Sequence, residues 1–390
     1  MLTERVLPIS RPYLSEDELR GVRDVFESHW LGQGSEVAAF EDAVGRYLGA
    51  KHVVAVSTGT TALQLALLAL DIGPGDEVIV PSLTFCASVQ AITACGATPV
   101  FCEVAPNDLN IDVADVKRRI TKRTKVIMPV HYCGNACDMD ALLALSKETG
   151  IAIVEDAAHA FGSRYGERML GSFGQLTCFS FDPIKNITCG EGGAIVTDRA
   201  EIAAQLRKMR FLGIDRNRPS GSGGEYDVVL QGYRFHMSNI NAAIGLAQMK
   251  RLEDFRRRKI AIVDRYNTVF ARLPYLSLLA WTLPETFPFT YVLRIAADRR
   301  EAFRDHLKSC GVGTGMHYPP NHLLSYFANG TDRLPVTEKV AQEIVTLPLY
   351  YEMSDEDIDR VIEAVRSFCE EMARPLPEAR GITAILPGRY

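Results

Sequence analysis

The chain has 390 residues, of which 47% are hydrophobic and 23% are charged, and its formal net charge is −5 at pH 7. These values are close to those of ordinary globular proteins, so they argue against a disordered or fibrous chain. The small negative charge argues against a protein whose main function is to bind nucleic acid through its phosphates.

Residues 1–12 lack the long apolar stretch of a signal peptide, and no later apolar run is long and charge-free enough to span a bilayer. We therefore expect a cytoplasmic protein. Its nine cysteines form no CxxC pair, which is typical of reduced thiols. Cys133, Cys137 and His131 are close enough in sequence to suggest a metal site. Because no second ligand pair follows at zinc-like spacing, buried thiols are favoured and no metal is predicted.

The first predicted element is an amphipathic helix over residues 16–28, with Ser15 as its cap and Glu18 completing a capping box. Short β-branched runs then alternate with helical patterns, which indicates βαβ units and a mostly parallel sheet. The seven predicted strands cover residues 52–56, 77–80, 98–102, 125–131, 151–155, 177–181 and 193–197. The helices between them cover residues 60–70, 87–94, 112–120 and 139–149. Several strands are apolar throughout, as expected when helices cover both faces of a sheet.

The pattern changes in the C-terminal third of the chain. A long helical pattern runs from residue 238 to 265, and it is followed by a predicted strand and two helices at 291–296, 300–308 and 355–369. The Gly-, Ser-, Arg- and Pro-rich stretch 214–224 predicts a mobile loop.

We therefore expect an α/β fold in three layers around a mostly parallel seven-stranded sheet. A large domain is predicted over residues 1–245, including the helix at 15–28. A smaller α+β domain is predicted over 246–374, followed by a poorly packed tail over 375–390.

The first candidate site is the run Ser57-Thr58-Gly59-Thr60-Thr61, between an apolar strand and a helix rich in alanine and leucine. Unpaired N–H groups at the helix start, a close backbone approach at Gly59 and the threonine hydroxyls would hold a phosphate. The spacing alone favours an ordinary strand-to-helix turn capped by Thr58 over a phosphate site.

Two further candidates follow predicted strands. Asp156 lies at the carboxyl end of a strand, where α/β proteins bind ligands, so it can meet a cationic group or simply cap the next helix. Lys185 lies between an apolar strand and a cluster of glycines, where a lysine with a lowered pKa can form a Schiff base, although most loop lysines are only solvated. In this order, a phosphate turn, a strand-end acid and a loop amine are the three contacts that pyridoxal 5′-phosphate (PLP) demands.

The chain also resembles a known family, the DegT-type (StrS-like) sugar aminotransferases of the aspartate aminotransferase superfamily, fold type I. The resemblance covers almost the whole chain and is collinear. It is carried by SRPYLSEDEL, WLGQG at 30–34, PSLTFCAS, PVHYCG, VEDAAHAFG, FSFDPIKNITCGEGG, HMSNINAAIG, MHYPPNH and LPLYYEMSDEDID.

The resemblance implies roles for individual residues. Lys185 would form the Schiff base with PLP and move the proton, and Asp156 would pair with the pyridine nitrogen. Phe85 would stack on the ring, although a core aromatic is the alternative from sequence alone. His159 would lie near the phenolic oxygen of the cofactor. The phosphate would be held by Gly59, Thr60 and Ser180.

One position departs from the family pattern. Many members carry an asparagine, contributed by the neighbouring subunit, where this chain has Arg234. Its guanidinium would hold the same phosphate, or it faces the substrate or the solvent. A contact across subunits implies a homodimer with a shared active site.

The family further implies an activity. Members that are sugar dehydratases have histidine in place of the Schiff-base lysine, so Lys185 favours transamination. The expected reaction is ping-pong amination of a nucleotide-linked 4-keto-6-deoxyhexose at C4 or C3, with glutamate as donor, in amino sugar biosynthesis for a polysaccharide or O-antigen. The sugar diphosphate could be bound by Arg210, Arg216 and Arg218, or these are surface charges. His317 and Tyr318 correspond to a region at the mouth of the active site, or to a turn set by the two prolines that follow.

Two other functions share these motifs. The acceptor could be a keto-inositol or another aminocyclitol precursor, because the cofactor motifs are common to both. The chain could also be a non-catalytic regulatory protein on the same fold. Retention of Lys185, Asp156 and Ser180 together argues against the regulatory protein.

Overall fold

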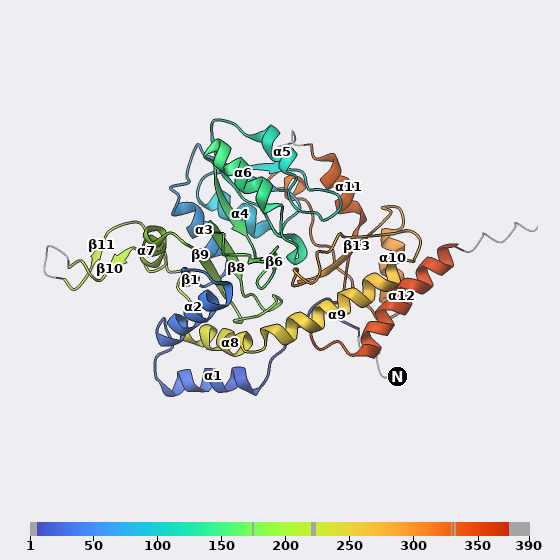
Figure 1. Cartoon of the computed structure of the whole chain (residues 1–390), viewed down its shortest axis with the longest axis horizontal. Coiled ribbons are helices and arrows are strands. Elements are labelled where there is room, and N and C mark those ends of the chain that lie inside the picture. The colour runs from blue at the N-terminus through green and yellow to red at the C-terminus, as the bar shows by residue number, and fades with distance from the viewer. Residues whose placement is uncertain (1–5, 174, 220–223, 329, 331–332, 374–390) are drawn as a thin grey trace, which may run out of the picture.

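The computed structural model describes residues 6–173, 175–219, 224–328, 330 and 333–373. Figure 1 shows a layered body around a central sheet, with a further group of helices and a small sheet next to it. The predicted tail at 375–390 lies outside the described residues, as does part of the predicted loop at 214–224. Within the described ranges, no helix combines the length and apolar character needed to cross a membrane.

The central sheet has seven strands in the order β1-β9-β8-β5-β4-β2-β3, which confirms the predicted α/β fold. The strands are β1 (His52–Val56), β2 (Glu77–Pro81), β3 (Thr98–Cys102), β4 (Thr124–Ile127), β5 (Ala152–Asp156), β8 (Leu176–Ser180) and β9 (Gly193–Thr197). Only β9 runs antiparallel to its neighbours in this sheet. The carboxyl ends of β1, β2, β5 and β8 therefore lie along one edge.

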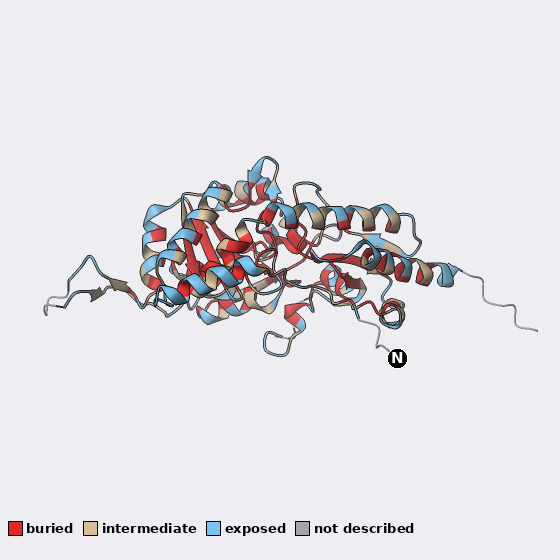
Figure 2. Ribbon diagram, turned by 90° about the horizontal axis from the view of Figure 1, so that it is seen from below, coloured by how far each residue is buried: buried red, intermediate tan, exposed pale blue. Residues whose placement is uncertain are grey.

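Helices cover both faces of the sheet, and the alternation of side chains along each strand explains why both faces are apolar. In β1, Val54 and Val56 belong to the core on one face, whereas Val53 and Ala55 belong to the core on the other. The first face is covered by α3 (Gly59–Leu68), α4 (Cys86–Ala94) and α7 (Ala200–Met209). The second is covered by α2 (Ser35–Leu48), α5 (Val113–Arg119), α6 (Met139–Thr149) and α8 (Asn239–Met249). Figure 2 shows the buried strands between these two layers.

The N-terminal helix α1 (Glu16–Glu27) begins at the predicted capping box of Ser15 and Glu18. Glu18 is buried, and its carboxylate also accepts a hydrogen bond from Gln248 on α8, at 2.7 Å. The helix therefore packs along α8 (Figure 1).

The C-terminal third forms an antiparallel sheet of β12 (Leu276–Leu278), β13 (Tyr291–Ile295) and β14 (Ile344–Leu347). Around it lie α9 (Leu252–Phe270), α10 (Arg300–Ser309), α11 (Pro335–Glu343) and α12 (Asp355–Ala373). The single helical pattern expected from residue 238 to 265 is divided between α8 and α9, which are separated at Lys250 and Arg251. The division into domains at residues 245 and 246 falls within α8 and stays a prediction.

Two short hairpins were not expected from the sequence. One joins β6 (Arg164–Tyr165) to β7 (Arg168–Met169). The other pairs β10 (Ile214–Asp215) with β11 (Asp227–Val228). The prediction of loop from residue 214 onward is therefore wrong at its start, because Ile214 and Asp215 pair with a strand that lies beyond the predicted loop.

Candidate active site

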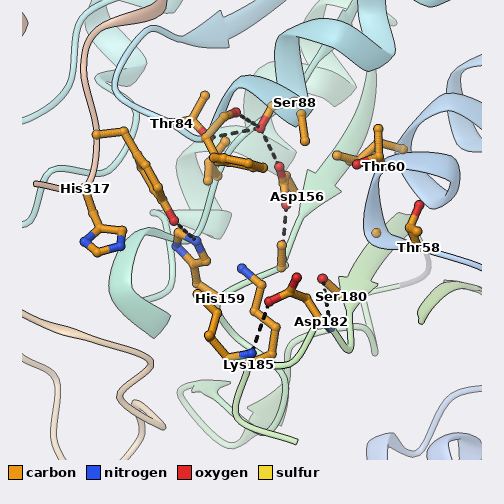
Figure 3. Close-up of a pocket in the computed structure, with 18 of the residues that line it drawn as sticks. Thr58, Thr60, Thr84, Ser88, Asp156, His159, Ser180, Asp182, Lys185 and His317 are labelled. Atoms are coloured by element: carbon orange, nitrogen blue, oxygen red, sulfur yellow. Dashed lines mark hydrogen bonds between the residues drawn. The ribbon is translucent and has the colours of Figure 1, made fainter. Parts of the chain in front are cut away.

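A cavity of about 410 Å³ lies at the carboxyl edge of the central sheet. Its walls come from the turns that follow β1, β2, β5 and β8, and from residues 317 and 318 (Figure 3). All the site residues predicted from the sequence line it, except Arg234 and the candidate diphosphate ligands Arg210, Arg216 and Arg218. The predicted residues that line it are Gly59, Thr60, Phe85, Asp156, His159, Ser180, Lys185, His317 and Tyr318.

Lys185 follows β8 in a tight turn, in which its backbone N–H donates to the carbonyl of Asp182 at 3.0 Å. Its side chain points into the cavity, toward Asp156 and His159 (Figure 3). The ammonium lies 4.4 Å from the centre of the Phe289 ring. Burial lowers the pKa of Lys185 to about 8, although the carboxylates of Asp156 and Asp182 act in the opposite direction. Near neutral pH, a much larger fraction of Lys185 is therefore the neutral amine than in a solvated lysine.

Asp156 is the last residue of β5, and its carboxylate is buried. One oxygen accepts a hydrogen bond from Ser88 Oγ at 2.6 Å, and the other accepts one from the backbone N–H of Ala158 at 3.0 Å. Burial raises the pKa of Asp156, and these two hydrogen bonds oppose that rise. No cation forms an ion pair with this carboxylate among the described residues, so it can receive a cationic group of a ligand.

His159 is buried between two aromatic rings. It stacks on Phe289 at a centroid distance of 4.3 Å, and its Nε2 lies 3.0 Å from the Tyr318 hydroxyl. Burial, together with the nearby charge of Lys185, holds the pKa of His159 well below its usual range, so the imidazole is neutral. Its Nδ1 is buried without a hydrogen-bond partner in the described structure, and a ligand oxygen would supply one.

The opposite wall is the start of α3. Thr58 caps the helix by accepting the N–H of Thr61 at 3.1 Å, which leaves the amides of Gly59 and Thr60 at the cavity. Gly59 packs against Ser180, and a Cβ at position 59 would lie only 2.7 Å from the Ser180 Cβ. Helix N-termini bind anions, so this wall is suited to a phosphate. The turn is thus the predicted strand-to-helix turn capped by Thr58, and it also lines the cavity, whereas phosphate binding at this turn stays a prediction.

Phe85, His317 and Tyr318 form the third side of the cavity. Phe85 is 53% exposed, so it is not a core aromatic, and its ring lies 5.6 Å from that of Tyr318. His317 Nδ1 lies 2.8 Å from the Thr346 hydroxyl on β14. Burial and Lys185 lower the pKa of His317 to about 4, so it is neutral at physiological pH.

Arg234 lies elsewhere in the chain. It lines a separate hollow of about 740 Å³ together with Arg216, Arg207 and the segment 30–34. Within one chain it therefore does not reach the Lys185 cavity. Arg210, considered from the sequence as a ligand for the sugar diphosphate, is buried in an ion pair with Glu41 and is not available for that role.

Among the residues of the site that were not predicted, two support the predicted ones directly. Ser88 holds Asp156 from α4, and Phe289 contacts both Lys185 and His159 from the segment before β13. Neither sits in a pattern that predicts chemistry. Ser88 belongs to the PSLTFCAS motif, but only the folded arrangement brings it to the end of β5.

Together these groups fit PLP on structural grounds. The start of α3 and Ser180 suit the phosphate of PLP, and the Asp156 carboxylate, which has no ion-pair partner among the described residues, suits a protonated ring nitrogen. The Nδ1 of His159, which has no hydrogen-bond partner in the described structure, suits a polar atom of the cofactor. Among the described residues lining the cavity, Lys185 is the only lysine or arginine. No cluster of three or more His, Cys, Asp or Glu side chains in the described ranges could hold a metal ion.

Comparisons with known proteins agree with this geometry. Residues 12–366 match the DegT/DnrJ/EryC1/StrS aminotransferase family. The chain is 40% identical over 381 residues to the spore coat polysaccharide biosynthesis protein SpsC of Bacillus subtilis (strain 168), covering 92% of this chain and 96% of SpsC.

Solved structures are similar throughout the chain. The aminotransferase TlmJ of Streptoalloteichus hindustanus superimposes with a TM-score of 0.89 at 34% identity, covering 94% of this chain and all of TlmJ (100%). The PLP form of the putative sugar aminotransferase Spr1654 of Streptococcus pneumoniae gives a TM-score of 0.88 at 31% identity, over 95% of this chain and 100% of that one.

Proposed function

The chain belongs to the DegT/DnrJ/EryC1/StrS aminotransferase family and is a PLP-dependent sugar aminotransferase, and from this premise we propose that it aminates a nucleotide-linked keto sugar. The acceptor is a 4-keto-6-deoxyhexose aminated at C4, or its 3-keto isomer aminated at C3, because the amino group replaces the carbonyl oxygen. Glutamate supplies the amino group and leaves as 2-oxoglutarate. The product is an amino sugar for polysaccharide synthesis, in keeping with the name of the relative SpsC.

The observation that carries the proposal is the placement of the Lys185 amine, which points into a cavity between an unpaired carboxylate and a helix N-terminus. When bound, PLP supplies an aldehyde for covalent attachment and a ring that withdraws electrons from the reacting carbon. Because its amine lies in the cavity, Lys185 would bind that aldehyde and then accept and return a proton. Its pKa of about 8 suits a group that must do both near neutral pH.

The surrounding residues hold and orient the cofactor. Asp156 keeps the ring nitrogen protonated, and Ser88 keeps Asp156 in place. His159, neutral and fixed by Phe289 and Tyr318, would hydrogen-bond the phenolic oxygen of the cofactor. Phe85, whose ring is exposed at the cavity, would stack on the cofactor ring.

The phosphate is bound by the amides of Gly59 and Thr60 and by the Ser180 hydroxyl. Lys185 is the only lysine or arginine among the described residues that line the cavity, so a second cation would strengthen phosphate binding. Arg234 of the partner subunit fills this role in a homodimer with a shared active site. His317 and Tyr318 contact the sugar. We place the enzyme in the cytoplasm.

The test is a stepwise reaction with the PLP-loaded protein. Glutamate alone should bleach the visible band of the cofactor and release one 2-oxoglutarate per site, because a ping-pong enzyme completes this half without an acceptor. A panel of nucleotide-linked 4-keto sugars and keto-inositols should then restore the band, with the aminated product identified by mass spectrometry. Restoration by keto-inositols alone would replace the proposed acceptor. A band indifferent to every amino donor would favour a regulatory protein.

A further inference from the structure

A second lysine, Lys259 on α9, is buried next to the segment that carries Lys185. Only 6% of Lys259 is exposed. Its ammonium donates hydrogen bonds to the side-chain oxygen of Asn186 at 3.0 Å and to the backbone carbonyl of Phe289 at 3.4 Å. Both acceptors are neutral.

The ammonium of Lys259 has no carboxylate partner within ion-pair distance in the described ranges. A fully buried lysine without such a partner is rare, because desolvating the charge is costly. The small cavity beside it is lined by Lys185, Arg11, Tyr13 and Tyr351, and Arg11 is itself paired with Glu352. Burial alone lowers the pKa of Lys259 to about 7.

Both acceptors of Lys259 lead directly to Lys185. Asn186 is the next residue in the chain, and its buried amide also donates to the carbonyls of Phe287 at 3.2 Å and Phe161 at 3.5 Å. Phe289 presents its ring to the ammonium of Lys185 at 4.4 Å. The same ring stacks on His159. The buried amine of Lys259 therefore contacts Asn186, which follows Lys185 in the chain, and Phe289, whose ring packs on the Lys185 ammonium.

We propose that Lys259 is a positioning residue for Lys185, acting through Asn186 and the backbone of Phe289. It fixes the segment after β8 relative to the segment before β13, so that the Lys185 amine and the His159 ring both face the cofactor. The inference rests on the proposed role of Lys185 as the residue that binds PLP. This role explains why a lysine is buried here despite the cost of desolvating it. Without Lys259, the side-chain oxygen of Asn186 and the carbonyl oxygen of Phe289 would lose this hydrogen-bond donor next to the Lys185 amine.

The experiment compares the PLP-loaded forms of Lys259→Met, Asn186→Ala and the double variant with the wild type. Methionine keeps the length of the side chain and removes its donors. The matched control is Lys250→Met, since Lys250 is exposed at the end of α8. We measure the PLP dissociation constant and the pH midpoint at which the visible band changes wavelength.

Each single variant should weaken PLP binding about tenfold, as expected for the loss of a buried hydrogen bond. The pH midpoint should move by about half a unit or more, because the surroundings of the Lys185 nitrogen change. A residue with a merely structural role would leave that midpoint unchanged. The loss in the double variant should be smaller than the sum of the two single losses, since both substitutions remove the hydrogen bond between Lys259 and Asn186. Lys250→Met should match the wild type.

Wild-type values for folded Lys259→Met, or full additivity in the double variant, would overturn the inference. If Lys259→Met does not fold, Asn186→Ala decides alone, because it breaks the contact and keeps the lysine. The proposed function has a separate failure. If the wild-type protein shows no visible band that depends on Lys185, both the proposed function and the role of Lys259 are overturned. If the wild-type band is normal and neither Lys259→Met nor Asn186→Ala changes it, only the role of Lys259 is overturned.

Discussion

Ser88 donates a hydrogen bond to the buried carboxylate of Asp156, with its Oγ 2.6 Å from Oδ2. The same hydroxyl lies 2.9 Å from Thr84 Oγ1, so the bond joins the segment after β2 to the end of β5. It stabilises the charged form of a carboxylate that burial makes harder to ionise. Ser88 thus helps Asp156 stay available for a cationic ring nitrogen.

Ser88→Ala should therefore raise the pKa of Asp156 further and weaken PLP binding. We expect a loss of about tenfold to a hundredfold in kcat/KM, corresponding to roughly 1.4–2.7 kcal/mol for a charge-assisted hydrogen bond. The control is Thr93→Ala on the same helix, whose hydroxyl bonds only the backbone of Gln90 among the described contacts. Equal activity of the two variants would contradict the role of Ser88.

The lowered pKa of Lys185 predicts how the cofactor-free protein takes up PLP. Only the neutral amine attacks an aldehyde, so the rate at which the visible band appears should rise with pH and level off above the pKa of about 8. Stopped-flow absorbance from pH 6 to 10, with Lys185→Ala as the baseline, measures this profile. A rate that still climbs steeply above pH 9 would indicate an ordinary lysine.

The close packing at Gly59 predicts a steric effect on the phosphate wall. In Gly59→Ala the new Cβ would lie 2.7 Å from the Ser180 Cβ, so α3 or Ser180 must shift. We expect a loss of about 1–3 kcal/mol in the free energy of unfolding, as for other overpacked sites, and weaker PLP binding. Gly73→Ala is the control, because its Cβ would meet its nearest atom at 3.9 Å. Thermal unfolding and PLP titration of both variants compare the two positions.

Burial of Lys259 predicts a pH-dependent difference in stability. Its pKa is about 7 when folded and about 10.4 when unfolded, so between these values the unfolded chain binds one proton more than the folded chain. The cost of burying the charge is thus complete below pH 7 and declines as the pH rises. Relative to Lys259→Met, the cofactor-free wild type should gain about 1.4 kcal/mol of unfolding free energy per pH unit in this window.

Chemical denaturation of both proteins at several pH values from 6 to 10 tests this expectation. A difference that does not change with pH would mean that Lys259 keeps the same charge in both states.

Much of the fold could be predicted because its signals are local. The seven strands are apolar runs bounded by turns, and each overlaps its predicted range. The direction of β9 could not be predicted, since an apolar run does not reveal whether its neighbours are parallel. The break between α8 and α9 carries no proline or glycine at Lys250 and Arg251, so the helical pattern reads as continuous.

The helix α2 was missed although its signal is present. Its buried residues Val37, Phe40, Val44 and Leu48 recur at helical spacing, and Gly49 ends it in a left-handed conformation.

The site divides in the same way. Lys185 and Asp156 could be predicted because each follows a strand, and parallel strands deliver their ends to one edge. Ser88, Phe289 and Lys259 could not, because their contacts join segments far apart in sequence and the residue types alone suggest helix and core positions.

The most direct test is to reduce the PLP-loaded protein with borohydride, digest it and locate the attached cofactor by mass spectrometry. Reduction fixes the cofactor to whichever amine binds it. We expect one modified peptide, carrying the phosphopyridoxyl group on Lys185. Modification of another lysine in its place, or none at all, would contradict this prediction.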